Sequence, residues 1–183
     1  MDTQVVASFT SKKGNDVVFR YPTLHDFDDL FTFACDIGSE DTFVALDAPP
    51  TEDEEHAYLT NLIERIEQKK AIYFMVYVNG KIAGNGQVDI GKGRHSHSGN
   101  IGIALMQLYR GEGIGTELMK SLIDEAKKLG LRLLTLTCFE TNVAALHVYE
   151  KLGFMKAGVI PGAIMHKGQY IGEVHYYLPL VNG

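Results

Sequence analysis

The middle of the chain alternates between apolar segments and short polar breaks in a way that predicts three consecutive β-strands. The first segment is rich in aromatic and β-branched residues and ends at Asn79-Gly80, the strongest short signal for a β-hairpin turn. A polar loop over 91–98 separates the second segment from the third. Because the strands are consecutive, they are expected to form an antiparallel meander. They span residues 71–78, 81–90 and 99–106.

Apolar residues recur at helical spacing in four other segments. Acidic residues mark the amino-terminal turns of the first two, with Asp28 and Asp29 in one and residues 52–55 in the other. The third segment carries an apolar stripe formed by Ile114, Leu118, Leu122, Ala126 and Leu129. The expected helices span residues 22–37, 51–70, 114–129 and 142–152.

The remaining segments complete a mixed sheet. Residues 16–21 are typical of a strand, and the polar first 15 residues allow one more short strand. Loops are expected over 38–50 and 161–170. A meander followed by alternating strands and helices indicates an α/β (α+β) fold, with a mixed sheet and helices on both faces. The later strands are expected at 131–139, 153–160 and 172–180.

Length and composition fit a single domain over residues 1–183. Hydrophobic residues make up 45% of the 183 and charged residues 22%, which is ordinary for a soluble globular protein. The net charge of −6 disfavours nucleic acid as a partner. Cys35 and Cys138 lie in apolar segments without metal or redox spacing, so they are expected to be buried thiols. The sequence shows neither a signal peptide nor a membrane-spanning run, which predicts a cytoplasmic protein without a membrane partner.

Residues 101–116 carry the clearest chemical signal. An apolar strand leads into Arg110-Gly-Glu-Gly-Ile-Gly115, and a helix begins at once. Glycines at alternate positions lack the Cβ atoms that would keep a ligand away from the backbone. Exposed amides in the first turn of a helix, with the helix dipole behind them, favour an anion such as a phosphate.

Several kinds of site can be built from such a glycine segment. A Walker loop requires Gly-Lys-Ser/Thr after four spacer residues, which this chain lacks. A dinucleotide fingerprint has Gly-x-Gly-x-x-Gly near the start of a doubly wound sheet, whereas the spacing here is Gly-x-Gly-x-Gly late in the chain. A coenzyme A site remains, as do glycines that only permit tight packing of the strand against the helix.

A second segment narrows the choice. Asn142-Val-Ala-Ala-Leu-His-Val-Tyr149-Glu-Lys-Leu-Gly-Phe154 follows the next strand, and Asn142 and Tyr149 lie two helical turns apart, so both can serve one face. Together with Arg110–Gly115 it resembles the GCN5-related N-acetyltransferase (GNAT) family. Members carry Arg/Gln-x-x-Gly-x-Gly/Ala and then Asn-x-x-Ala-x-x-x-Tyr-x-x-x-Gly-Phe. Both patterns match here in order and spacing, strongly over residues 81–154 and weakly over the first 70.

The resemblance implies a mostly antiparallel sheet of about seven strands that splays between the fourth and fifth, with acetyl-CoA between them. Its pantetheine amides would pair with the backbone of Ile103, Ala104 and Leu105. Its diphosphate would lie on backbone amides of the glycine segment, where Arg110 adds a charged contact and Glu112 fits only if its side chain points to solvent. These amides belong to Gly111, Glu112, Gly113, Ile114, Gly115 and Thr116.

The resemblance also implies a ternary complex in which an amine attacks the thioester directly. Tyr149 matches the general acid that protonates the departing thiolate, because the pKa values of phenols and thiols are close. Asn142 would contact the cofactor or an ordered water, and it would also cap its helix. In some members a glutamate acts as the general base at the position where this chain has Thr137. The general base of this chain could therefore be Glu140, Glu173 or a chain of water molecules.

The acceptor is expected to be a primary amine, either a small molecule or a peptide: a small amine, a polyamine, an amino acid or a protein N-terminus. Acids that attract cations line the predicted cleft walls, although helix capping and solubility explain most of them better. The alternative function is a non-catalytic acyl-CoA-binding sensor, and a homodimer is compatible with either. No metal is expected, because His95 and His97 lack a third ligand nearby. The acids are Asp26, Asp28, Asp29, Asp36, Glu40, Asp41 and residues 52–55.

Overall fold

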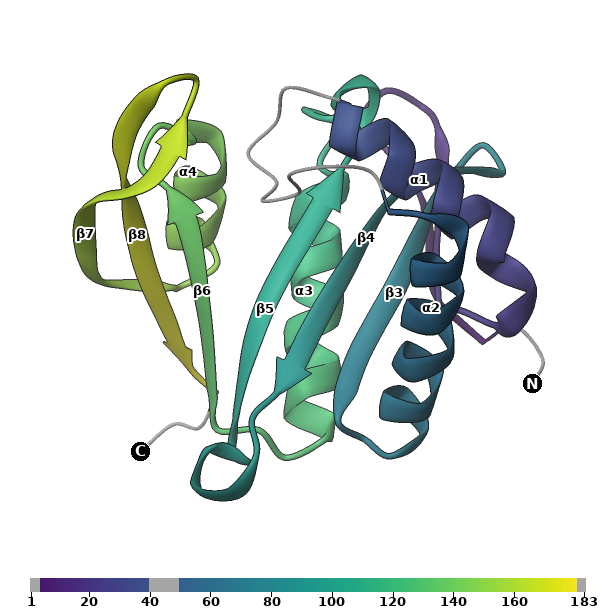
Figure 1. The fold of residues 1–183 in the computed structure, drawn as a ribbon, viewed down its shortest axis with the longest axis horizontal. Helices are drawn as coiled ribbons and strands as arrows, with labels where there is room; N and C mark the ends of the chain where they lie inside the picture. Colours follow the sequence, from purple (N-terminus) through teal and green to yellow (C-terminus); the bar gives the residue numbers. More distant parts are fainter. Residues whose placement is uncertain (1–3, 40–49, 181–183) are drawn as a thin grey trace.

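The protein is built on one sheet of eight strands, seen in a computed structural model that describes residues 4–39 and 50–180 (Figure 1). The strands lie in the order β1-β2-β3-β4-β5-β6-β8-β7, and every neighbouring pair is antiparallel except β5 with β6. The expected mixed sheet is therefore confirmed. The strands are β1 (Val5–Thr10), β2 (Asp16–Arg20), β3 (Ala71–Val78), β4 (Lys81–Ile90), β5 (Ser98–Leu105), β6 (Leu133–Phe139), β7 (Met155–His166) and β8 (Gln169–Pro179).

Four α-helices in the described part of the chain cover both faces of this sheet, as the hydrophobic pattern predicted (Figure 1). On one face, Leu30 of α1 and Leu59 of α2 pack with Tyr73 and Met75 of β3. On the other face, α3 and α4 contribute to a larger core that includes the central strands. The helices are α1 (Phe27–Ser39), α2 (Glu52–Glu67), α3 (Ile114–Lys128) and α4 (Val143–Lys151).

The packing of α3 explains why the strand beneath it carries glycine. A Cβ atom added at Gly86 of β4 would lie 2.8 Å from a methyl carbon of Leu122, so only glycine permits this close approach. The stripe predicted for this helix is confirmed, because four of its members are fully buried and Leu129 is half-buried. The four are Ile114, Leu118, Leu122 and Ala126.

Both ends of the sheet differ from the sequence-based expectation. The optional early strand exists as β1, which brings the total to eight rather than about seven. The prediction of a loop over 161–170 is wrong, because β7 continues through His166 and turns at Lys167-Gly168 into β8. Both turn residues have positive φ, 51° and 76°. Most side chains of this hairpin end are exposed, so they leave no buried face whose alternation a sequence pattern could detect.

The first helix begins later than its predicted start at Pro22-Thr23. A 3₁₀ turn over Leu24–Asp26 comes first, and Thr23 and Asp26 form a capping box on it. Arg20 Nη1 also donates to Asp26 Oδ2 at 2.7 Å, which ties this turn to β2. The loop predicted over 38–50 falls largely on residues 40–49, outside the described residues. Among the helices that the structure describes, none is long and apolar enough to cross a membrane.

The sheet opens between β5 and β6. These parallel strands pair only at Ser98 with Leu133, Gly99 with Leu134 and Asn100 with Thr135. Beyond this short zone they diverge toward their carboxyl ends, which Figure 1 shows on either side of the centre. Because β1 adds a strand, β5 and β6 are the fourth and fifth strands of the predicted count, and the predicted splay is confirmed.

Candidate active site

The diverging strands leave one edge of β5 open. After Asn100, residues 101–105 pair with β4 on one side, and no described strand pairs with them on the other. Unpaired backbone amides and carbonyls need water or a ligand as partner. Ile103 and Ala104, predicted to pair with pantetheine, lie on this edge, and the Leu105 carbonyl accepts from Arg110 Nε at 2.8 Å.

The glycine segment forms the turn between this open edge and α3. A 3₁₀ turn over Gln107–Tyr109 follows β5, and Gly111 and Gly113 then adopt φ of 77° and 87°, in the left-handed region that favours glycine. Gly115 keeps the helix start close to β5, because a Cβ added there would lie 3.3 Å from Ile103 Cδ1. The strand therefore leads directly into the amino-terminal end of a 15-residue helix.

Most of the predicted phosphate-binding amides are available. Within the described part of the chain, the backbone amides of residues 111–115 donate to no protein acceptor. The Thr116 amide differs, because it donates to the Gly113 carbonyl at 3.1 Å as part of the first helical turn. Free amides that converge at a helix N-terminus suit an anion.

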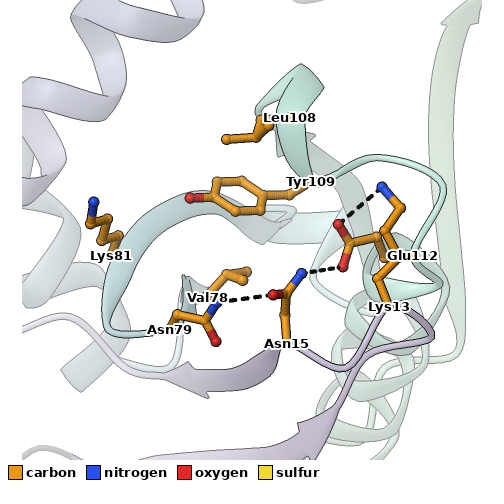
Figure 2. A pocket seen from close by; sticks show the side chains of 8 residues that line it. All are labelled: Lys13, Asn15, Val78, Asn79, Lys81, Leu108, Tyr109 and Glu112. Carbon is orange, nitrogen blue, oxygen red and sulfur yellow. Dashed lines mark hydrogen bonds and ion pairs between the residues drawn. The ribbon is translucent and has the colours of Figure 1, made fainter.

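The side chain of Glu112 does not point to solvent, so that part of the prediction is wrong. The residue is only 3% exposed, and its carboxylate faces the turn between β1 and β2 (Figure 2). Ser11 Oγ donates to it at 2.7 Å and Asn15 Nδ2 at 2.8 Å, while Lys13 Nζ lies 3.3 Å away. The hydrogen bonds from Ser11 and Asn15 and the charge of Lys13 hold the pKa of Glu112 below its usual range.

Sequence reasoning missed these partners because they lie about a hundred positions away along the chain, at separations of 101 and 97 residues. The same turn adds two further contacts to the glycine segment. The Lys12 amide donates to the Glu112 carbonyl at 3.2 Å, and a Cβ added at Gly113 would lie 3.4 Å from Lys12 Cε. A lysine stem therefore runs beside the amino-terminal end of α3.

A cavity of about 440 Å³ lies beside Glu112 (Figure 2). Two turns of the sheet meet there, where Asn79 Nδ2 donates to Asn15 Oδ1 at 2.9 Å. Tyr109 and Leu108 border it from the 3₁₀ turn before the glycine segment. The glycine segment is thus positioned by the β1–β2 turn and the β3–β4 turn together. The cavity is lined by Lys13, Asn15, Val78, Asn79, Lys81, Leu108, Tyr109 and Glu112.

The predicted general acid lies on α4, which follows β6 on the other side of the opening in the sheet. Asn142 caps α4, and its Oδ1 accepts from the Ala145 amide at 3.2 Å, so the capping part of its prediction is confirmed. Tyr149 follows two turns later, is 8% exposed and meets the rings of Phe154 and Tyr176 at 6.0 and 6.1 Å. Burial raises the pKa of Tyr149, and no described residue hydrogen-bonds its hydroxyl. The phenol therefore retains its proton until a strong base reaches it.

The two predicted bases lie on the same side of this opening in different surroundings. Glu140 Oε1 accepts from the Gly172 amide at 2.6 Å, which joins the end of β6 to β8. Glu173 lies opposite Phe139 on β8, with its Oε2 3.0 Å from His175 Nε2. Thr137, at the position where some relatives carry the base, is the cross-strand partner of His175. The geometry brings Glu173, His175 and Thr137 together and uses Glu140 as a backbone acceptor.

A larger cavity, of about 720 Å³, lies between α1, α2 and the open strand. Ile103 and Ala104 of β5 line it, so it reaches the predicted cofactor edge. Of the acids expected at the cleft walls, Glu54 and Glu55 line it, whereas Asp26 is paired with Arg20. The other expected acids do not line it, and Glu40 and Asp41 lie outside the described residues.

A model of the acetyltransferase (GNAT) family matches residues 39–154, well over half of the chain. The matched stretch includes the open strand, the glycine segment and α4. The chain belongs to the GNAT acetyltransferase family. GNAT enzymes are acetyltransferases that take the acetyl group from acetyl-CoA, and the open edge and free amides fit this cosubstrate.

Individual relatives agree with this assignment. The L-amino acid N-acetyltransferase AaaT of Escherichia coli is 27% identical over 121 residues, which is 64% of this chain and 74% of that protein. An acetyltransferase of the GNAT family from Streptococcus pneumoniae superposes with a TM-score of 0.81 at 26% identity, over 89% of this chain and 99% of that one. The fold of yncA from Salmonella typhimurium, solved with its cofactor acetyl-CoA, has a TM-score of 0.77 at 16% identity over 91% and 95% of the two chains.

Proposed function

We propose that the protein transfers the acetyl group of acetyl-CoA to the nitrogen of a primary amine within one ternary complex. The observation that supports this most strongly is the continuity of the open edge of β5 with the free amides of residues 111–115. An extended ligand with amides at one end and a diphosphate at the other matches that order of backbone groups.

The binding roles follow from this alignment. The backbone of Ile103, Ala104 and Leu105 pairs with pantetheine, and the amides of residues 111–115 bind the diphosphate. Arg110, whose Nε donates a hydrogen bond to the Leu105 carbonyl at the end of β5, would add a cation to this diphosphate site. Lys12 adds a second cation from the β1–β2 turn. Asn142 uses its Oδ1 as a cap, which leaves its Nδ2 to contact the cofactor or an ordered water.

The reaction needs three proton transfers besides the acyl transfer. The ammonium first loses a proton, and the neutral nitrogen then forms a bond to the thioester carbonyl carbon. The carbon–sulfur bond breaks, and Tyr149 protonates the departing thiolate. The phenol then regains a proton from the new amide nitrogen, so the products are an amide, free CoA and one proton. Burial of Tyr149 keeps its phenol protonated, but the raised pKa also lies further from that of a thiol than the pKa of a free phenol does. The support for its role as the acid is its position on α4, two helical turns after Asn142.

Glu173 is the better of the two glutamate candidates for the base. Its carboxylate lies beside His175 on β8, while the Glu140 carboxylate accepts a hydrogen bond from the Gly172 amide. A chain of water leading to solvent would serve the same purpose. The Glu173→Gln variant separates these options through the pH dependence of kcat, which reports groups in the ternary complex: its acid limb is removed only if the Glu173 carboxylate accepts the proton.

The test of this function is the release of free thiol from acetyl-CoA in the presence of a broad set of primary amines. We expect release above the rate without enzyme for at least one amine, together with formation of the N-acetylated product. Tight CoA binding with no thiol release for any amine would instead support the acyl-CoA-binding sensor, which Thr137 at the position of the family base favours.

A further inference from the structure

The cavity between α1, α2 and the sheet has a floor of strand residues and walls of helix residues. Its floor is formed by Tyr73 of β3, Asn85 and Gln87 of β4 and Gly102 and Ala104 of β5. These β4 and β5 residues are cross-strand partners, Asn85 of Ala104 and Gln87 of Gly102, so they share one face of the sheet. The cavity therefore opens directly onto the strand that is proposed to hold the thioester.

Glu55 is the buried charge of this cavity. It lies in the first turn of α2, is 6% exposed and lines the cavity. Among the described residues, no side chain or backbone group donates a hydrogen bond to its carboxylate, and no cation pairs with it. Its neighbour Glu54 is different, because Glu54 is exposed and accepts from the amide and hydroxyl of Thr51 at 2.8 Å.

The Glu55 carboxylate oxygens are not sealed from water, because the fully buried side-chain atom without a hydrogen-bond partner in the described part of the chain is His175 Nε2. The carboxylate is partly desolvated at the cavity wall and gains no hydrogen bond or opposite charge from the protein, so an ammonium bound in the cavity would supply the favourable contact that the protein does not. Burial raises the pKa of Glu55, which is the expected sign for a carboxylate whose partner is absent. An ammonium group is the cation that the proposed reaction consumes.

The rest of the cavity limits what that ammonium can be attached to. One wall is apolar, formed by Leu30, Phe33, Ala34 and Ile37 of α1. The lining that the structure describes contains no lysine, arginine or histidine. A carboxylate next to the nitrogen, as in a free amino acid, would therefore meet the charge of Glu55 without a compensating cation.

The polar groups of the floor are partly used within the protein. Asn85 Nδ2 donates to the Tyr73 hydroxyl at 2.6 Å, and Tyr58 of α2 also lines the cavity. These neutral groups can orient a ligand, but they do not balance a charge. Glu54 also lines the cavity, but its exposed carboxylate already accepts from Thr51. The one buried carboxylate beside an apolar wall therefore matches one ammonium on an apolar body better than it matches a polyamine, which carries several charges.

We propose that this cavity is the acceptor site and that Glu55 binds the ammonium of a primary amine with an apolar body and no carboxylate beside the nitrogen. The inference rests on the proposed function and specifies its substrate class. Glu55 would contact the acceptor directly, so its side chain is a substrate-binding group that positions the nitrogen near Ala104.

The test compares 2-phenylethylamine with phenylalanine, which differ only by the carboxylate. We expect kcat/KM for the amine to exceed that for the amino acid by about 100-fold, because an unpaired buried charge is costly. The Glu55→Gln variant should raise KM for the amine about 10- to 100-fold and leave KM for acetyl-CoA unchanged. Glu55→Asp keeps the charge and should recover part of the loss, and Glu52→Gln, at an exposed position of the same turn, is the matched control.

Calorimetry keeps the inference separate from catalysis. With CoA present, 2-phenylethylamine should bind the wild-type protein and bind Glu55→Gln at least about ten times more weakly. If no amine releases thiol but this difference in binding is found, the proposed function fails and Glu55 stands as the ammonium-binding group of an amine-binding site. Equal binding to both proteins, no binding to the wild type, or a preference for phenylalanine would overturn the acceptor site.

Discussion

Two buried glutamates in this molecule have opposite surroundings. Glu112, in the glycine segment, receives hydrogen bonds from Ser11 and Asn15 and the charge of Lys13, and its pKa is lowered. Glu55, in the cavity between the helices and the sheet, has no described partner, and its pKa is raised. Both side chains are more than nine-tenths buried, so burial alone does not distinguish them.

The difference separates a structural role from a binding role. The protein itself satisfies the carboxylate that lies next to the proposed diphosphate site, so its charge fixes the loop and does not oppose the anion. The protein leaves unsatisfied the carboxylate that faces the proposed acceptor site. A buried charge whose partner is absent from the protein is a good indicator of a site for a ligand of opposite charge.

The largest expected effect belongs to neither glutamate but to Tyr149, on the other side of the opening in the sheet. The Tyr149→Phe variant should lower kcat about 100- to 1,000-fold, because it removes the proton donor for the thiolate. KM for acetyl-CoA should stay within a factor of about two, since the open strand and the amides are untouched. Steady-state kinetics with varied acetyl-CoA measures both values. An equal loss of turnover and of cosubstrate affinity would make Tyr149 a structural residue.

The next largest effect is the pH dependence of kcat/KM that Glu55 should cause. Because the pKa of Glu55 is raised, the charged form that binds an ammonium is lost as the pH falls through that raised value, above the ordinary range near 4.3. We expect kcat/KM for the amine to fall on that limb by about tenfold per pH unit. In Glu55→Gln this limb should disappear, leaving a low and flat profile there. An unchanged acid limb in the variant would assign the limb to another group.

Stability should change in opposite directions at the two sites. At neutral pH, Glu112→Gln should lower the melting temperature, because the lowered pKa means that the charged form stabilises the fold. That contribution is present above the unfolded-state pKa and is lost as the pH falls through the folded-state pKa. Glu55→Gln should raise the melting temperature at neutral pH, because a raised pKa means that the charged form destabilises the fold.

Thermal unfolding of the wild type and both variants at pH 7 and pH 4 measures this pair of effects. At pH 4 the Glu55 difference should shrink, since its raised pKa brings the carboxylate toward the neutral form that glutamine imitates. The Glu112 difference should begin to shrink there and disappear only at lower pH, below its lowered folded-state pKa. A loss of stability in both variants at pH 7 would remove the distinction between the two glutamates.

The smallest expected effect concerns the backbone at the start of α3. Gly113→Ala places a side chain at a φ of 87°, which should destabilise the protein by about 1–2 kcal/mol and weaken acetyl-CoA binding. Gly158→Ala is the matched control, because that glycine has no positive φ and a Cβ there would meet nothing within 4 Å. Chemical denaturation compares the two variants, and equal losses would contradict a conformational role for Gly113.

Hydrophobic patterning predicted the centre of the molecule closely. The strands 71–78 and 81–90 have the predicted bounds, because the first is buried along its whole length and the Asn79-Gly80 turn fixes where the second begins. The hairpin of β7 and β8 could not be predicted, because its outer end is exposed and held by backbone pairing.

In the candidate site, too, the residues set by local sequence could be predicted and those set by distant contacts could not. Local spacing was enough to place the glycines of the loop and the cap and tyrosine of α4, since these depend on one helix each. The burial of Glu112 depends on the β1–β2 turn about a hundred residues earlier, and the sequence offers no signal for that contact. Glu55 was visible only as one acid in the run 52–55, and its lack of a partner emerges only once the helices are packed on the sheet.

The most direct test of the central distinction is a crystal structure of the protein with CoA and 2-phenylethylamine bound together. The account predicts the diphosphate on the amides of residues 111–115, with Glu112 still joined to Ser11 and Asn15. It predicts the amine nitrogen about 3 Å from a Glu55 carboxylate oxygen. An ammonium bound away from Glu55, or a diphosphate bound away from the glycine segment, would contradict it.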